Sequence, residues 1–166
     1  MAEKTLEDLF HDTLRDIYYA EKKILKGLTK LGKAAELPAL KAAFEKHYDE
    51  TEGQLERLEQ VFELIDKRPR GKTCPAIDGI LEEGDEIASE YKGTAALDAG
   101  LVSAAQAVEH YEIARYGTLK RWARMLGMDE AVKLLDTTLQ EESATDEALS
   151  KLAEQLANEK ALQPAE

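Results

Sequence analysis

Residues 101–119 read LVSAAQAVEHYEIARYGTL, and this stretch decides which class of fold the chain can form. Its apolar residues recur every three or four positions, which places them on one face of an α-helix. Two acids interrupt that face, because Glu112 stands at its centre and Glu109 lies beside it. The stretch therefore predicts a helix that turns an apolar face, with acids at its middle, toward the interior of the protein.

The same helical periodicity covers most of the chain. The apolar residues predict helices at about 5–32, 38–67, 76–90, 95–126 and 129–158. Alanine, leucine, glutamate and lysine dominate the composition, whereas there are only four prolines and three phenylalanines among 166 residues. This composition favours helices, and the length suits one domain with a sizeable core. We therefore expect a single all-α domain over residues 1–166.

The links between these helices differ in length. Short links follow the first and the fourth predicted helix, and Thr5, Thr94 and Asp129 are the expected N-caps. The second helix ends at residues 68–75, which read RPRGKTCP and break any regular structure. One long crossover is the connectivity of ferritin-like bundles, whereas up-and-down bundles use short loops throughout. The link lengths thus predict a ferritin-like four-helix bundle whose long crossover contains a short extra helix.

Acids also interrupt the apolar faces of the other long helices. Glu21 stands in the middle of the first face, and Glu142 and Asp146 replace two core positions of the last. In the second helix Glu50 lies at the flank of the apolar face, three positions after His47. All four long helices are therefore expected to direct at least one acid toward the interior.

Acids gathered in a core need a compensating charge, because each buried and unpaired carboxylate costs several kcal/mol. The inward stripes near these acids contain no lysine or arginine. Divalent cations are the remaining candidates, since carboxylates are hard ligands that can bridge two metal ions. A single glutamate in an apolar stripe is usually at the rim with its head in water. The same pattern in four helices favours a metal site, with hydrated or protonated acids as the alternative.

The net charge of −12 argues against partners that carry negative charge. Nucleic acids and anionic membranes are bound through basic residues, which are the minority here. The N-terminal sequence MAEKTLED does not resemble a signal peptide, and no stretch approaches the ~20 apolar residues of a membrane span. The lone Cys74 cannot form an internal disulfide. We therefore expect a cytoplasmic protein that binds neither nucleic acid nor membrane.

Residues 107–119, AVEHYEIARYGTL, closely resemble the signature of the YciF-type, stress-associated ferritin-like proteins of bacteria. Four other segments resemble the same family: YAEKK at 19–23, HYDET at 47–51, GILEEG at 79–84 and LQEESATD at 139–146. The resemblance covers nearly the whole chain. It implies a rubrerythrin-like four-helix fold, a homodimer, a dinuclear iron centre and a role in bacterial stress responses.

The resemblance also implies a set of metal ligands: Glu21, Glu50, Glu112, Glu142 and Asp146, with Glu109 and His47 as further candidates. Better-known di-iron bundles carry a Glu-x-x-His pair on two helices, and this chain has no such pair. A site built almost entirely of oxygen has a weaker preference for iron over manganese. We expect two metal ions and either iron oxidation or peroxide handling. The alternative is a non-enzymatic structural or protein-interaction module.

Overall fold

The computed structural model describes residues 2–164, which form helices joined by short loops and one long connection. The elements are α1 Leu6–Ala34, α2 Pro38–Leu64, α3 Pro75–Glu90, α4 Leu97–Met125, α5 Asp129–Leu152, a π-helix Ala153–Ala157 and α6 Asn158–Ala161. No strand occurs within this described part. The expected all-α fold is thus confirmed, and the predicted helix ranges agree with α1 to α4 to within a few residues.

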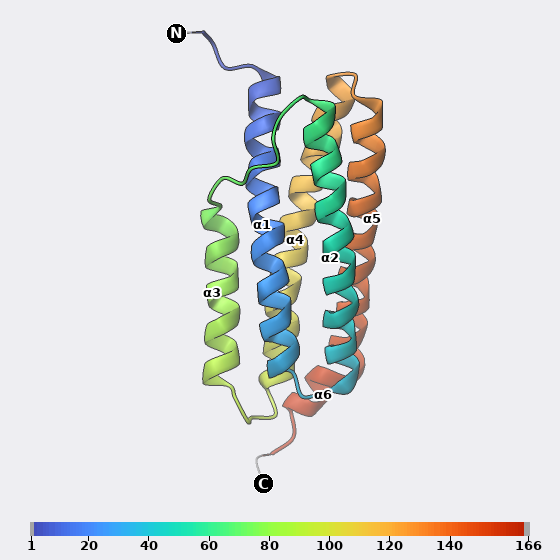
Figure 1. Ribbon diagram of the computed structural model, residues 1–166. Helices are drawn as coiled ribbons and strands as arrows, with labels where there is room; N and C mark the ends of the chain where they lie inside the picture. Colours follow the sequence, from blue (N-terminus) through green and yellow to red (C-terminus); the bar gives the residue numbers. More distant parts are fainter. Residues whose placement is uncertain (1, 165–166) are drawn as a thin grey trace.

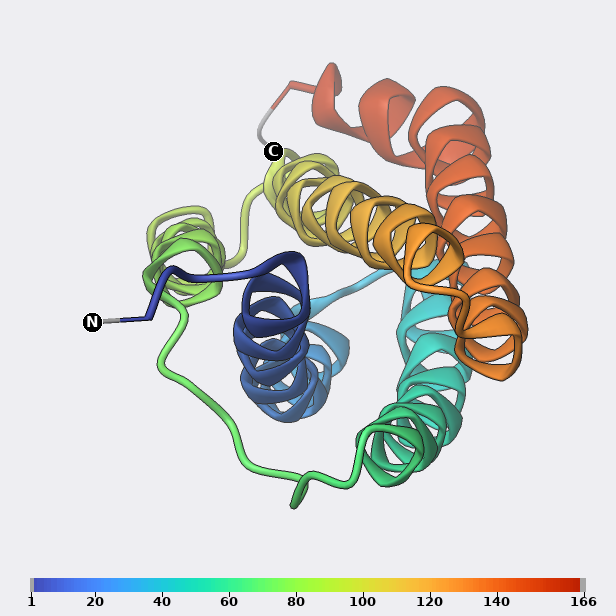
Figure 2. The same ribbon diagram turned by 90° about the horizontal axis from the view of Figure 1, so that it is seen from above.

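Helices α1, α2, α5 and α4 surround a common core, as the view along the bundle shows (Figure 2). Neighbouring helices run in opposite directions, whereas α2 and α4 run in the same direction (Figure 1). Two parallel helices cannot be joined by a tight turn, so the connection from α2 to α4 has to return along the length of the bundle. One such crossover among short links is the connectivity of ferritin-like bundles.

Helix α3 lies in this crossover and packs on the outside of the bundle, over the groove between α1 and α4 (Figures 1 and 2). Two glycines allow it to approach closely. A Cβ atom on Gly27 of α1 would stand 2.8 Å from Leu81 Cδ2, and one on Gly100 of α4 would stand 2.6 Å from Ile87 Cγ2. Side chains of α3 therefore fill notches in both helices and close this side of the bundle.

The N-caps predicted from the sequence agree with the structure only in part. The Thr5 hydroxyl accepts the amide N–H of Asp8 while the Asp8 carboxylate accepts that of Thr5, so the first N-cap is confirmed. The expected caps at Thr94 and Asp129 were wrong, because the N-caps are Ala96 and Met128. Thr94 donates its hydroxyl to the Tyr91 carbonyl instead.

The last predicted helix, 129–158, is not continuous. Helix α5 ends at Leu152 and a π-helix of five residues follows, so the expected α-helix was too long. Its wider turn shifts the chain sideways, and α6 then lies across the end of the bundle (Figure 1). Among the described residues, no helix combines the length and apolar character that crossing a membrane would require.

Asp98 joins three segments at this end of the bundle. Its fully buried carboxylate accepts the amide N–H groups of Glu36 at 2.8 Å and Leu37 at 3.1 Å, both in the link between α1 and α2. Lys160 of α6 donates its ammonium group to the same carboxylate at 3.1 Å. One carboxylate on α4 therefore holds both the α1–α2 link and the C-terminal helix.

Replacing Asp98 with alanine is expected to destabilise the fold by about 2–4 kcal/mol, because two backbone donors and a lysine lose their acceptor. The free energy of unfolding in urea, followed by circular dichroism, measures the loss. Asp85→Ala is the control, since that half-exposed carboxylate pairs with the exposed Lys30 in the described structure and its loss should change stability little. Equal stability of the two variants would contradict this role for Asp98.

Candidate metal centre

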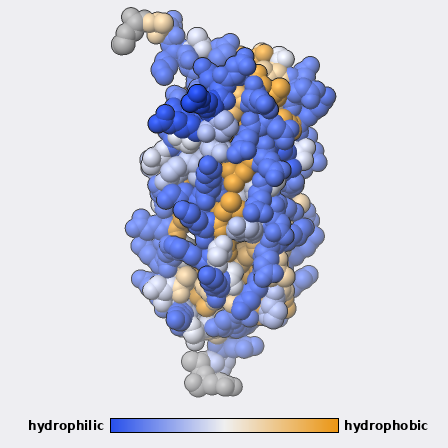
Figure 3. Space-filling view, in the orientation of Figure 1, coloured by the Kyte–Doolittle hydropathy of each residue, from blue (hydrophilic) through white to orange (hydrophobic). Residues whose placement is uncertain are grey.

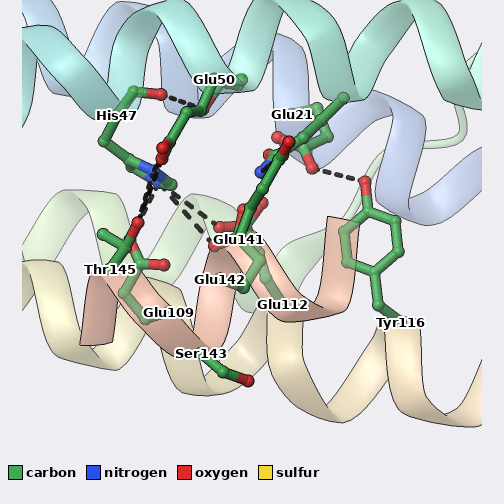
Figure 4. Close-up of polar contacts among 12 residues, drawn as sticks. Glu21, His47, Glu50, Glu109, Glu112, Tyr116, Glu141, Glu142, Ser143 and Thr145 are labelled. Atoms are coloured by element: carbon green, nitrogen blue, oxygen red, sulfur yellow. Dashed lines mark hydrogen bonds and ion pairs between the residues drawn. The ribbon is translucent and has the colours of Figure 1, made fainter. Parts of the chain in front are cut away.

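Three helices of the bundle bring four buried side chains together near the middle of the core. His47 comes from α2, Glu109 and Glu112 from α4, and Glu142 from α5. Each offers one nitrogen or oxygen atom, and these four atoms lie within 4.8 Å of one another. All four side chains are at most 2 % exposed. Figure 4 shows them converging between the helices, and we call this group the His–Glu cluster.

The imidazole of His47 holds the cluster together electrostatically. Its Nε2 lies 2.9 Å from Glu109 Oε1, 3.8 Å from Glu142 Oε2 and 3.9 Å from Glu112 Oε2. On α4, Glu109 and Glu112 stand one turn apart and would repel each other if both were ionised without a partner. One imidazolium ring is therefore shared among three carboxylates.

Glu21 of α1 extends the cluster on the side away from His47 (Figure 4). Its side chain is fully buried, and the hydroxyl of Tyr116 donates a hydrogen bond to its Oε1. Tyr116 comes from α4, one turn after Glu112, and is itself completely buried. The hydrogen bond fixes one oxygen of Glu21 and leaves the other, Oε2, without a partner in the described structure.

Many buried oxygens of this region lack a hydrogen-bond partner among residues 2–164. They are Oε2 of Glu21, Oε2 of Glu109, and both carboxylate oxygens of Glu112 and of Glu142. Buried polar atoms are almost always satisfied, and each exception costs free energy. Six orphaned carboxylate oxygens beside one imidazole are the donor set that a divalent cation takes. The residues present therefore fit a metal site.

The predicted ligands do not all lie in this interior. Glu21, Glu109, Glu112 and Glu142 are inside. Glu50 stands at the edge with its side chain 23 % exposed, where it accepts a hydrogen bond from Thr145. The two carboxylate oxygens of Asp146 instead face Gln106 at 3.2 Å and His110 at 3.1 Å. The ligand roles of Glu50 and Asp146 thus stay predictions, without a contact to the three buried acids of the cluster.

His47 is more central than its sequence context suggested. The sequence made it only a further candidate ligand, three positions before Glu50. His110 is 68 % exposed and pairs with Asp146 rather than with the cluster. Tyr116 could be expected near the site only from its spacing, four positions after Glu112.

Comparison with known proteins gives the family. Residues 5–162 match the profile described as "Domain of unknown function (DUF892)". The chain is also 45% identical over 159 residues to Protein YciF of Escherichia coli K12, covering 95% of this chain and 96% of that protein. The chain belongs to this family. The YciF-type resemblance of the sequence motifs is thereby confirmed, and the protein is a DUF892 protein along nearly its whole length.

Solved structures of similar proteins show the same fold. The crystal structure of the E. coli stress protein YciF superposes with a TM-score of 0.89 at 44% identity, covering 94% of this chain and 99% of that one. A protein from Rhodopseudomonas palustris, YcfI, gives 0.86 at 50% identity over 89% and 94% of the two chains. A protein from Xanthomonas campestris gives 0.73 at 25% identity, over 93% and 94%.

In this DUF892 protein, burial changes the proton affinity of the cluster. Burial, reinforced by the charge of Glu142, raises the pKa of Glu21 from 4.5 to about 7. Burial and neighbouring acids hold the pKa values of Glu112 and Glu142 well above the ordinary range. Burial alone would lower the pKa of His47, but contacts with Glu109 and Glu50 raise it well above 6.5. Without metal, the cluster is therefore stabilised by bound protons.

The metal-free protein is expected to be more stable at pH 5 than at pH 8. The pKa of Glu21 is higher in the folded state, so its contribution is complete below about pH 4.5 and is lost as the pH rises through about 7. A shift of this size corresponds to about 3 kcal/mol, and the raised pKa of His47 acts in the same direction. Urea unfolding of chelator-treated protein at both pH values measures the difference.

Glu21→Gln is the matched variant for this experiment, because it keeps the side-chain size but cannot ionise. Its stability should change less between pH 5 and pH 8 than that of the wild type, by up to about 3 kcal/mol. The same pH dependence in both proteins would show that Glu21 does not titrate in this range.

Proposed function

We propose that this DUF892 protein binds two divalent metal ions in the core of its bundle, with iron as the expected metal and manganese as the second choice. The observation that carries the proposal is the set of six buried carboxylate oxygens without partners around a single imidazole. A cation that satisfies them removes the desolvation cost and the mutual repulsion of the acids in one step. Its relative YciF of E. coli is a stress protein. We propose that this protein also acts in stress protection.

The His–Glu cluster is the proposed site of the first ion, because its four ligand atoms lie within 4.8 Å of one another. Glu21 then serves the second ion together with Glu142, whose charge acts on it, and Glu112, which contacts its carboxylate. Carboxylates can bridge two metals, so Glu112 and Glu142 can belong to both ions. One imidazole among oxygen ligands suits Fe(II) and Mn(II), and His47 was already a candidate ligand in the nearly all-oxygen set that the sequence implied.

Iron held in this way would supply one-electron chemistry toward oxygen or peroxide. The protein's own residues bind the metal, exclude water and hold protons. The protons that Glu21, Glu112, Glu142 and His47 retain in the metal-free state must leave when these side chains become ligands. Metal affinity should therefore rise with pH over the range in which the metal-free protein loses stability.

A structural role without turnover is the second candidate. It is supported by the description of the R. palustris relative, which suggests a structural protein. The contact of His47 Nε2 with Glu109 at 2.9 Å also supports it, since a protonated imidazole offsets part of the acidic charge without a metal. In this case the four helices would remain associated when no ion is bound.

Metal content separates the two candidates. The protein is purified without an affinity tag, reconstituted anaerobically with Fe(II) or Mn(II), freed of excess metal and measured by mass spectrometry. About two ions per chain support the dinuclear site, and one ion per chain restricts binding to the His–Glu cluster. Protein that retains no metal and whose thermal midpoint does not respond to metal favours the structural role, because a bound ion must stabilise the folded state.

Two neighbouring glutamates provide a matched pair of variants. Glu142 faces the cluster, whereas Glu141 binds Arg57 and accepts a hydrogen bond from Gln54. Glu142→Gln is expected to lose at least half of the bound metal. Its metal-free form should be no less stable than the metal-free wild type, because a neutral amide replaces a buried acid of the same size.

Glu141→Gln carries the same change in charge and should keep its metal. Mass spectrometry and urea unfolding of both variants therefore separate ligand loss from general destabilisation. Wild-type metal content in Glu142→Gln would remove Glu142 from the proposed ligands.

A further inference from the structure

A metal ion must reach a cluster whose side chains are almost completely buried, and most sides of the bundle are closed. On the α1–α4 side, Leu81 of α3 fills the notch at Gly27. A cavity of only about 10 Å³ remains beside Glu109, and its other lining residues are apolar. An ion would have to lose its water among hydrocarbon side chains to pass there, which is very costly.

The α1–α2 side carries a strip of hydrophobic residues on an otherwise hydrophilic face (Figure 3). A groove of about 350 Å³ lies there, with the buried side chains of Leu28 and Phe44 in its lining. No residue of the His–Glu cluster lines this groove. On the α4–α5 side, Asp146 faces Gln106 and His110 and makes no ion-pair contact with the described cluster residues.

The α2–α5 side differs because polar side chains lead from solvent to the cluster. Glu50 of α2 is 23 % exposed, whereas the four cluster residues are at most 2 % exposed. Its Oε2 accepts a hydrogen bond from Thr145 of α5 at 3.2 Å and lies 3.7 Å from His47 Nδ1. The other ring nitrogen, Nε2, faces Glu109 at 2.9 Å. The His47 ring therefore joins a carboxylate at the surface to those of the interior (Figure 4).

We propose that Glu50 is the access residue through which metal ions enter and leave the cluster, between α2 and α5 and past the ring of His47. This inference rests on the proposed metal site but assigns Glu50 a different role from that of a permanent ligand. A partly exposed carboxylate such as that of Glu50 can replace part of the hydration shell of an arriving cation. It can then release the cation to the orphaned oxygens, which bind it more strongly because they are buried and several of them act together.

Lys46 forms an ion pair with the carboxylate of Glu50 from the solvent side. Its ammonium nitrogen lies 3.7 Å from Glu50 Oε1, and its side chain is 77 % exposed. An arriving cation must compete with this positive charge. Lys46 therefore slows uptake, and its removal should change the rate in the direction opposite to the removal of Glu50.

An access residue and a permanent ligand differ in their kinetics. Losing a permanent ligand weakens the bound state, so that metal leaves faster and the Kd rises. Losing an access residue raises the barrier for both directions and leaves the bound state unchanged. Association and dissociation then slow by the same factor, and the Kd stays constant.

Mn(II) is the probe, with the full-length metal-free protein under anaerobic conditions. Uptake is followed by the disappearance of the electron paramagnetic resonance signal of free Mn(II), and release by transfer to an excess of chelator. Glu50→Gln is expected to slow both by about 10-fold, the lower end of electrostatic effects on association. Its Kd should stay within about 2-fold of the wild type. Asp136→Asn, which removes a charge on α5 that is paired with Lys120, should leave both rates unchanged.

Lys46→Gln gives the second measurement, and its exposed position keeps the fold intact. It should accelerate uptake by about 2- to 5-fold, the size expected for one partly screened charge. Lys151→Gln is its control, because Lys151 is also largely exposed, at 63 %, but lies on α5 and contacts Glu147. Uptake that is unchanged in both Glu50→Gln and Lys46→Gln would overturn the access route.

Faster release with a weaker Kd in Glu50→Gln would instead make Glu50 a permanent ligand and would also overturn the proposal. Failure of the underlying metal site looks different. In that case the wild-type protein itself would bind no Mn(II), and neither variant could restore binding.

Discussion

The burial of four glutamates around one imidazole is the constraint on which the rest of the structure depends. Apolar residues above and below this layer hold the helices together, and the helices in turn keep the acids out of water. Such an arrangement persists only if the charge is neutralised by protons, by His47 or by a cation. The fold and the chemistry of the site are therefore one problem. The helices that stabilise the bundle also bury the acids at its centre, which is unfavourable until a proton, the His47 imidazolium or a cation compensates their charge.

The sequence predicted most of this arrangement because helical spacing determines which side chains face inward. Glu21, Glu112 and Glu142 interrupt apolar stripes, and all three are fully buried in the structure. The orientation of side chains at the flank of a stripe could not be predicted in this way. Glu50 and Asp146 lie where a small rotation of the helix, or another rotamer, decides between core and surface. The orientation is determined by hydrogen-bond partners on other helices, namely Thr145 for Glu50 and Gln106 for Asp146.

Helix ends were harder to predict than helix faces. Thr5 caps its helix through a reciprocal contact with Asp8, which is a local pattern. Thr94 lies in an equally favourable local sequence but bonds to Tyr91, because the chain needs another turn before α4 begins. The π-helix after Leu152 likewise has no local signal. It places Lys160 against Asp98, so a contact between distant parts of the chain determines where α5 ends.

The crossover makes the two sides of the cluster different. Helix α3 covers the α1–α4 side, which we call the dry side, whereas the α2–α5 side is the wet side. On the dry side, the thiol of the buried Cys74 accepts the amide N–H of Ile77 at the start of α3 and contacts the hydroxyl of Tyr111 at 3.0 Å. This contact fixes α3 over the groove between α1 and α4. On the wet side, no comparable element covers α2 and α5 in the described structure (Figure 2).

This asymmetry would affect both the strength and the rate of the proposed metal binding. A site closed on all sides would bind a cation tightly but exchange it only when the bundle opens, at a cost close to that of unfolding. A site open on all sides would leave its carboxylates hydrated and would lose the advantage of burial. One polar edge would resolve the conflict, because the proposed ligands stay buried while the partly exposed carboxylate of Glu50 remains in contact with solvent. The protons held by the metal-free cluster would then limit the affinity of the proposed site, since an ion that binds has to displace them.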